Sequence, residues 1–254
     1  MPPMHEMNTA PSSDPRVADL VRAGRLRAAL FLPQYRRDAN GEFCGVWVEV
    51  VRALGRHIGL SVEILALSTP AEMLACLADG GCDVASLGFD PARANQVGGF
   101  SPPFIQVSYT YLVPPGSAIG STVDVDHPGV RIAAVCDHAS TLALTRIIKH
   151  AEFIIIDTPD QAFEALRCGG ADAWATILPT ALAYAVRLSG ARVLDGSYGV
   201  NRPALVVPKG QTARLAYISE FVEHAKTSGL VQRAIDRAGE TGYRVADRSL
   251  ESAS

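Results

Sequence analysis

The sequence lacks the features typical of nucleic-acid-binding, membrane-spanning and metal-binding proteins. Its 254 residues carry 23 basic and 26 acidic side chains, so there is no basic excess to attract a nucleic acid. No apolar run approaches the roughly 20 residues that a helix needs to insert across a membrane. The six histidines are scattered, and no HxH, HExxH or Cys/His spacing indicates a metal site. Walker, GxGxxG and GxSxG motifs are also missing, so neither a cofactor nor a nucleophilic enzyme has direct support.

Cysteine pairs and an export signal are missing as well. The five cysteines are odd in number and form no CxxC motif: Cys44, Cys76, Cys82, Cys136 and Cys168. Residues 1–15 contain no basic segment followed by an apolar core. Free thiols in a reducing compartment fit this pattern better than a secreted disulfide framework, which favours a cytoplasmic location unless a signal has been removed.

The hydrophobic content, in contrast, is high enough for two ordinary cores. It amounts to 48% of the residues, and segments of strand and helix character alternate along the whole chain, which predicts an α/β fold. Two segments are similar in kind, each with a helix end, Gly-Gly, Asp and an apolar strand: LADGGCDVASL (77–87) and LRCGGADAWAT (166–176). The repeat predicts two Rossmann-like lobes of similar wiring, with mixed sheets, joined by a two-strand hinge.

We expect the first lobe to be formed by two separate segments of the chain and the second lobe by one. We assign residues 1–24 to an N-terminal tail, 25–108 with 207–245 to the first lobe, 112–200 to the second lobe, and 246–254 to a C-terminal tail. The chain would then cross between the lobes twice, near 108–112 and near 201–206.

Local signals predict several helices. Apolar residues recur at helical spacing over 46–58 and stop at Gly59, and Thr69-Pro70 with Glu72 resembles a capped helix start. We also expect helices over 140–150 and over most of 212–238, and a polar loop over 36–42.

The segment GFDPARANQVGGFSPPF at 88–104 resembles the signature of solute-binding protein family 3. Four further segments lie in the order found in that family: GVWVEVVRALGRHIGL (45–60), LADGGCDVA (77–85), YTYLVPPGS (109–117) and GGADAW (169–174). The resemblance covers roughly residues 25–240. It implies a type II periplasmic-binding-protein fold, which closes two lobes on a small solute, and a periplasmic location.

In the first lobe, the resemblance places the ligand-binding arginine at Arg93. A guanidinium offers two parallel donors that match a carboxylate; the alternative is a surface arginine paired with a nearby acid. The family often has threonine five residues earlier, where this chain has Gly88, so only a backbone N–H is available there, with Ser86 nearby. The acid that commonly pairs with a ligand's ammonium is also replaced, by about Ile177. The resemblance therefore implies a carboxylate or other anion without that amine.

In the second lobe, the turn CDHAST at 136–141 is expected to meet the ligand at a helix N-terminus, which suits an anion. Asp137 either contacts the ligand or caps the helix, and His138 either donates to an anion or lies partly exposed in a loop. Ala139 and Ser140 are the small and hydroxyl residues that the resemblance places at this turn.

Aromatic and amide side chains supply the remaining candidates. Phe31, Gln34 and Tyr35 follow the first strand, where the family places an aromatic ring over the ligand. Trp47 and Trp174 are expected more in the core than in a cleft wall, and Tyr198 and Asn201 are expected at the hinge or the pocket.

The sequence thus predicts a binder of a small anionic solute, a carboxylate, in a cleft between two lobes. It would serve either an ABC permease in an uptake system or a stand-alone role. One alternative is a cytosolic lyase or dehydratase that reuses the cleft, with Asp137 and His138 facing Arg93. Another is a ligand-sensing subunit that binds a partner protein.

Overall fold

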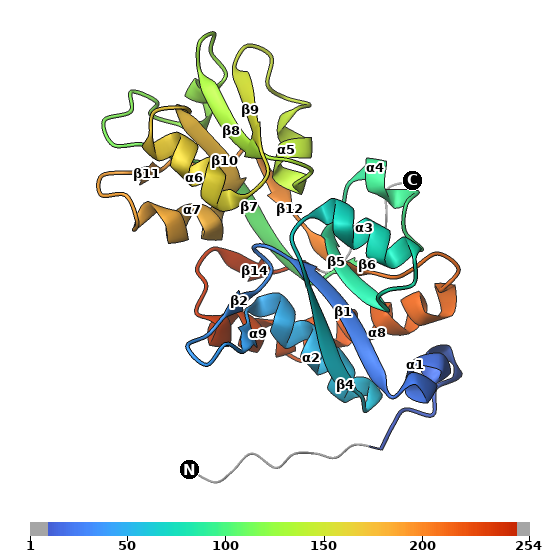
Figure 1. Ribbon diagram of the computed structural model, residues 1–254. Helices are drawn as coiled ribbons and strands as arrows, with labels where there is room; N and C mark the ends of the chain where they lie inside the picture. Colours follow the sequence, from blue (N-terminus) through green and yellow to red (C-terminus); the bar gives the residue numbers. More distant parts are fainter. Residues whose placement is uncertain (1–9, 248–254) are drawn as a thin grey trace, which may run out of the picture.

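The computed structural model describes residues 10–247, which form two α/β lobes, each built round its own sheet (Figure 1). The first sheet has the strand order β4-β1-β5-β13-β6, and the second has the order β11-β7-β10-β8-β9 with β12 and β14 also paired to β7. Residues 1–9 of the expected N-terminal tail and 248–254 of the expected C-terminal tail lie outside the described residues.

The first lobe combines parallel and antiparallel pairing. β1 pairs in parallel with β4 and β5, and β13 runs antiparallel to both β5 and β6. A small hairpin of β2 and β3 replaces part of the expected polar loop. The strands are β1 (Arg25–Phe31), β2 (Arg36–Arg37), β3 (Phe43–Cys44), β4 (Ser61–Leu67), β5 (Val84–Gly88), β6 (Phe100–Pro103) and β13 (Pro203–Val206).

Helices cover both faces of this sheet. One apolar core joins the sheet to α2, α8 and α9, and a smaller core on the other face joins it to α3. The second half of the expected N-terminal tail forms η1 and α1, whose Val17 and Leu20 are buried in the larger core. The helices are η1 (Pro15–Val17), α1 (Ala18–Ala23), α2 (Val46–Ile58), α3 (Pro70–Ala78), α4 (Pro91–Ala94), α8 (Thr212–Thr227) and α9 (Leu230–Ala238).

The second lobe repeats the layered arrangement. Its sheet lies between α6 and α7 on one face and α5 on the other, so successive strand residues such as Ala173 and Trp174 enter different cores. Its elements are β7 (Ile105–Val113), η2 (Thr122–Val125), β8 (Arg131–Val135), α5 (Ala139–Leu144), β9 (Glu152–Ile156), α6 (Pro159–Arg167), β10 (Ala173–Ile177), α7 (Leu178–Ala185), β11 (Arg192–Val193) and β12 (Gly199–Asn201).

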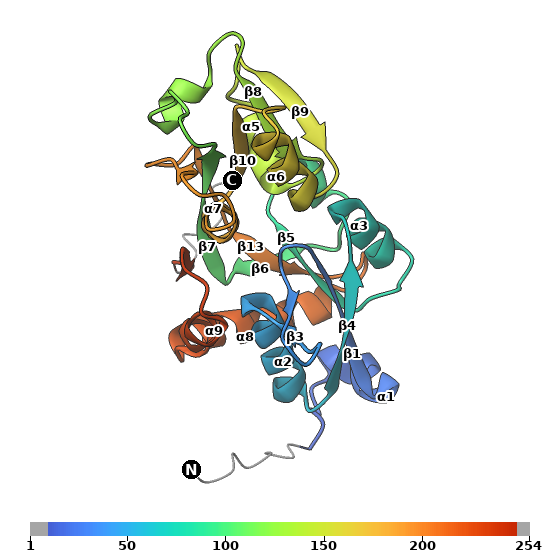
Figure 2. The ribbon, with the colours of Figure 1, turned by 60° about the vertical axis from the view of Figure 1, so that its left-hand side comes forward.

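Strand β7 extends from one lobe into the other (Figure 2). Its first residues, 105–107, pair with β14 (Tyr243–Val245), while its later residues pair with β10, β11 and β12. Ile105 and Val107 nevertheless pack in the large core of the first lobe. The second crossing runs from β12 through Arg202 into β13, which is hydrogen-bonded in the first sheet.

Two helices begin with the same local motif, one in each lobe. The hydroxyl of Thr69 accepts a hydrogen bond from the N–H of Glu72 at 3.1 Å, and the Glu72 carboxylate accepts one from the N–H of Ser68 at 2.8 Å. Thr158 caps α6 in the same way, with Gln161 in the place of Glu72. The returning side chain reaches the residue before the cap, one position earlier than a capping box requires.

Two expected helices are shorter or broken. α5 ends at Leu144 rather than near 150, because the Asp126 carboxylate accepts hydrogen bonds from the N–H groups of 149, 150 and 151 and holds them outside a helix. The expected helix over 212–238 divides into α8 and α9 at Gly229, whose φ of 73° lies in the left-handed region.

The helix cap at Thr69 gives a stability prediction. The substitution Thr69→Ala removes the hydroxyl that accepts from Glu72 N–H and should lower the free energy of unfolding by about 1 kcal/mol. Urea denaturation measures this change. The matched variant Thr158→Ala should cost a similar amount, and no loss in either variant would contradict the role of the two caps.

Candidate functional site

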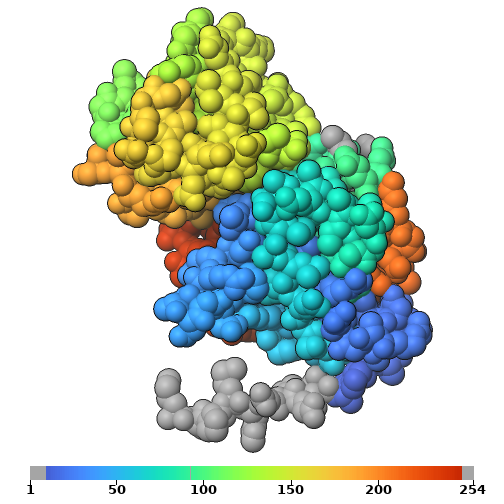
Figure 3. Space-filling model, viewed as in Figure 1, coloured from blue at the N-terminus to red at the C-terminus, as the bar shows by residue number. Residues whose placement is uncertain are grey.

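The two lobes lie against each other (Figure 3). Between them is a cavity of about 40 Å³. Its walls come from the carboxyl ends of strands and the first turns of helices in both lobes, which is where open α/β sheets bind ligands. The lining residues are Phe31, Pro33, Gln34, Trp47, Gly88, Arg93, His138, Ala139, Ser140, Pro159, Thr176, Ile177, Thr180 and Asn201.

Arg93 joins the two lobes through backbone oxygens. It lies in the short helix α4, directly after β5, and is only 4% exposed. Its Nη1 donates to the carbonyl of Gly88 in its own lobe at 3.3 Å, and its Nη2 donates to the carbonyl of Asp137 in the other lobe. Burial lowers the pKa of Arg93, although nearby Asp90, Tyr109 and Asp137 oppose that change.

An ion pair crosses between the lobes beside Arg93. Nη2 of Arg146 lies 2.7 Å from Oδ2 of Asp90, whose side chain is 4% exposed. Because Asp90 immediately precedes α4 and its carbonyl accepts from the N–H of Arg93, this pair also fixes the position of the arginine.

Gly88 allows the two lobes to approach closely. A Cβ atom at this position would lie 2.4 Å from Oδ1 of Asn201 and 2.8 Å from Cβ of Ala139. The second distance is the harder one to relieve, because an alanine Cβ is held by its backbone. The sequence showed only that a threonine of the family pattern was missing here; the contact with the other lobe explains why a side chain does not fit.

His138 is the N-cap residue of α5 and faces the first lobe. Its ring meets that of Phe31 edge-on, with 5.5 Å between centroids. Burial, and next the charge of Arg93, lowers the pKa of His138 to about 4, although the charge of Asp137 raises it. At neutral pH the imidazole is therefore uncharged, and Arg93 is the charged side chain at the cavity.

The other expected residues divide into two groups. Phe31, Ala139 and Ser140 line the cavity, and so does Gln34, whose side-chain amide also donates to the carbonyl of Ser86 at 2.8 Å. Three expected residues lie elsewhere.

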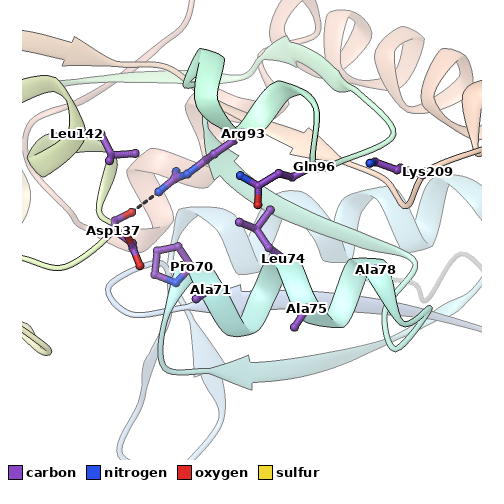
Figure 4. A pocket seen from close by; sticks show the side chains of 10 residues that line it. All are labelled: Pro70, Ala71, Leu74, Ala75, Ala78, Arg93, Gln96, Asp137, Leu142 and Lys209. Atoms are coloured by element: carbon purple, nitrogen blue, oxygen red, sulfur yellow. Dashed lines mark hydrogen bonds between the residues drawn. The ribbon is translucent and has the colours of Figure 1, made fainter.

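Ser86 is buried in β5 and is not among the residues that line the cavity. Tyr35 packs edge-on against Phe43 and lines a separate groove. Asp137 has a left-handed φ of 56° and contributes its carbonyl rather than its exposed carboxylate to Arg93. It borders an outer groove with Arg93 on one side and α3 on the other (Figure 4).

The structure adds residues that the sequence did not single out, or left ambiguous. Trp47 belongs to the core and also lines the cavity, and its Nε1 has no hydrogen-bond partner. Oδ1 of Asn201 likewise has none. Trp174, in contrast, is fully buried under the second sheet. Thr176 and Thr180 lie on either side of Ile177, at which the sequence analysis noted that the family's acid is replaced. That replacement was the one feature of the sequence that pointed to this segment.

The cavity wall carries positive and polar groups without an acid. Among its fourteen residues, all within the described part of the chain, only Arg93 and His138 have basic side chains and none is aspartate or glutamate. Three helices that contribute to the wall, α2, α5 and α7, begin without a side-chain cap. Their first N–H groups are therefore left for other partners.

Residues 10–247 contain neither a cluster of metal ligands nor a helix that could span a membrane. In that range no three His, Cys, Asp or Glu side chains gather in a group that could hold a metal ion. Within the same residues no helix has the length and apolar character needed to cross a bilayer.

Two sheet-centred lobes that close on a cavity define the class of two-lobed binding proteins with the type II periplasmic-binding-protein fold. The chain belongs to the bacterial extracellular solute-binding proteins, family 3, whose model matches residues 29–240. The expected family and fold are thereby confirmed.

The chain is also similar to solved structures and to part of a larger sensor protein. It is similar to a solute receptor for L-cysteine of Neisseria gonorrhoeae, with a TM-score of 0.78, 22% identity, and coverage of 87% of this chain and 92% of that one. It is also similar to AncCDT-1, an ancestral amino-acid-binding protein and precursor of cyclohexadienyl dehydratase, with a TM-score of 0.76, 23% identity, and coverage of 87% and 98%.

The virulence sensor protein BvgS of Bordetella pertussis (strain Tohama I) is 26% identical over 196 residues, which cover 75% of this chain. Those residues span only 16% of the length of the sensor.

The close contact at Gly88 predicts that adding one methyl group there changes the closure of the two lobes. Gly88→Ala should separate the lobes, because the new Cβ would overlap Ala139. Small-angle X-ray scattering should therefore give a larger radius of gyration for the variant than for the wild type. Gly120→Ala is the matched control, since its Cβ would lie 3.4 Å from the nearest atom, on Asp124. Identical scattering from all three proteins would contradict the prediction.

The buried imidazole predicts a pH dependence of stability. The unfolded chain protonates His138 near pH 6.5, whereas the folded chain does so only near pH 4. The contribution of the neutral ring is therefore complete above about pH 6.5 and is lost as the pH falls toward 4.

Between pH 7.5 and pH 5, the wild type should lose on the order of 1–2 kcal/mol more unfolding free energy than His138→Gln. Urea titrations at the two pH values measure the difference, in which other titrating groups cancel. Equal losses in the two proteins would show that His138 does not keep its lowered pKa in solution.

Proposed function

We propose that the chain binds a small carboxylate in the cavity between its lobes. The observation that carries this proposal is the one-sided charge of the wall, where Arg93 and His138 stand without an acidic side chain. The Arg93 guanidinium donates to the backbone carbonyls of Gly88 and Asp137, and no carboxylate lines the cavity beside it. A carboxylate in the cavity would offer Arg93 an ionised acceptor, which makes a stronger hydrogen bond than a neutral carbonyl does.

The helix ends support the same choice of charge. The uncapped first turns of α2 and α7 present N–H groups and the positive ends of their dipoles beside the cavity. Helices α3 and α6, in contrast, have threonine caps. Trp47 adds an indole N–H that has no partner. An anion would accept from these donors as well as from Arg93.

The lack of an acid argues against an ordinary α-amino acid as the ligand. A buried ammonium without a counter-charge costs several kcal/mol, and the segment from Thr176 to Thr180 offers only hydroxyl and apolar side chains to the cavity. The Neisseria receptor binds L-cysteine, so this chain would differ from that relative in the part of the ligand beyond the carboxylate.

As a biological role, we propose the substrate-binding component of an ABC-type uptake system or a stand-alone solute binder. The alternative enzyme, with Asp137 and His138 as acid and base, would require a proton to move between the cavity and these side chains. His138 is uncharged at neutral pH and would have to act first as the base. Incubation of a bound acid with the protein, followed by mass spectrometry, distinguishes turnover from stoichiometric binding.

The arginine gives the direct test of the proposed function. Arg93→Ala should weaken binding of a monocarboxylate by at least about 30-fold, equivalent to about 2 kcal/mol, because the carboxylate loses its charged partner. Isothermal titration calorimetry measures the dissociation constants. The matched control is Arg192→Ala, which removes an exposed guanidinium that donates to the carbonyls of Ser117 and Ile119.

Arg192→Ala should bind the acid with wild-type affinity. Wild-type affinity in Arg93→Ala as well would overturn the assignment of Arg93 as the anchor.

A further inference from the structure

The cavity between the lobes has room for the head group of a ligand but is too small for the rest of it. Its volume of about 40 Å³ compares with the roughly 10–15 Å³ of such space that a cavity needs to hold one water molecule, so it has room for only a few heavy atoms. With the lobes at this separation, a carboxylate fits beside Arg93 but a side chain does not. The rest of a ligand must therefore lie outside this cavity.

A larger groove begins at the same walls. Pro33, Pro159 and Thr180 line both the cavity and a groove of about 820 Å³ that runs between the lobes. The first lobe contributes residues after β1 and after α9, and the second contributes the starts of α6 and α7. The recess on the left of Figure 3, between the orange surface of α7 and the blue and red surfaces of the first lobe, lies in this region.

The charged side chains of the groove are already paired within the protein. Nε of Arg36 lies 3.1 Å from Oε1 of Glu240. The carboxylate of Asp160 accepts from the hydroxyl of Tyr184 at 2.8 Å and pairs with Arg187 at 3.1 Å. The groove therefore has no unmatched charge to recognise a second charged group on a ligand.

Apolar and aromatic side chains make up much of the remaining wall. Leu182 and Val186 lie on one side, with Val186 86% exposed, and Tyr243 lies on the other. The Tyr243 ring packs edge-on against Trp47 of the cavity wall, with 5.2 Å between centroids. An aromatic surface therefore continues from the cavity into the groove.

We propose that the ligand is a monocarboxylate with an uncharged, apolar tail, and that the tail leaves the cavity beside Thr180 and lies in the groove. This inference rests on the proposed function, since it needs Arg93 to hold the carboxylate. It adds the class of ligand: alkanoic and arylalkanoic acids are favoured over acids with a second charge.

A homologous series of ligands tests the tail. Acetate, butyrate, hexanoate and 4-phenylbutyrate should bind with increasing affinity, by about three- to fourfold for each buried methylene. Ligand-observed NMR measures the weak members and calorimetry the tighter ones. Glutarate, which carries a second carboxylate at the end of its chain, should bind more weakly than hexanoate.

A pair of tryptophan variants tests the groove. Ala183 is exposed and lines the groove, so Ala183→Trp should fill it without disturbing a core. This variant should bind acetate as the wild type does and should lose most of the gain from acetate to 4-phenylbutyrate. Ala118→Trp places the same side chain on an exposed loop of the second lobe, away from the groove, and should keep the full gain.

The outcomes separate the inference from the function on which it rests. Equal affinities for acetate and 4-phenylbutyrate, both lost in Arg93→Ala, would overturn the apolar tail and leave the carboxylate site intact. Tighter binding of glutarate than of hexanoate would also overturn it. If none of the acids bound in an Arg93-dependent way, the proposed function itself would fail.

Discussion

The contact of the Arg93 guanidinium with carbonyl oxygens of both lobes is the interaction on which the closed structure depends. Arg93 is almost fully buried, and a charge in that position is stable only when its donors are satisfied. The carbonyls of Gly88 and Asp137 meet that need. The glycine is without a side chain, the aspartate takes up a left-handed conformation, and the Asp90–Arg146 ion pair holds the same segments together. Closure and the proposed recognition of an anion thus use one side chain.

The two spaces at this interface have different chemistry. The enclosed cavity presents donors without an acid, whereas the groove beyond Thr180 presents rings and aliphatic side chains, and its ion pairs are internal. The cavity therefore suits the polar head of a ligand, and the groove suits an apolar body. The solved relatives share the fold at 22–23% identity. Identity at that level is compatible with a cavity wall of different chemistry in each protein, since function depends on the site and not on the fold.

Elements with local signals could be predicted from the sequence, and contacts between distant residues could not. The helix over 46–58 has the bounds that its periodicity indicates, since the pattern itself determines them. α5 ends early because Asp126, distant in sequence, binds the N–H groups of 149–151. The family resemblance identified Arg93 and the missing acid near Ile177. It could not show that Asp137 offers its carbonyl to Arg93, or that Tyr35 and Trp47 lie in different spaces, because both depend on how the lobes meet.

The pairing of β7 has a mechanical consequence. Residues 105–107 are hydrogen-bonded to β14, and Ile105 and Val107 pack in the core of the first lobe. The rest of the strand is hydrogen-bonded to β10, β11 and β12 in the second sheet, so the lobes are connected by a continuous ladder. Sheets deform by twisting and coiling. Opening is then an elastic deformation of that ladder, with a restoring force, and differs from free rotation about a linker. Opening the cleft to admit or release a solute therefore works against that restoring force.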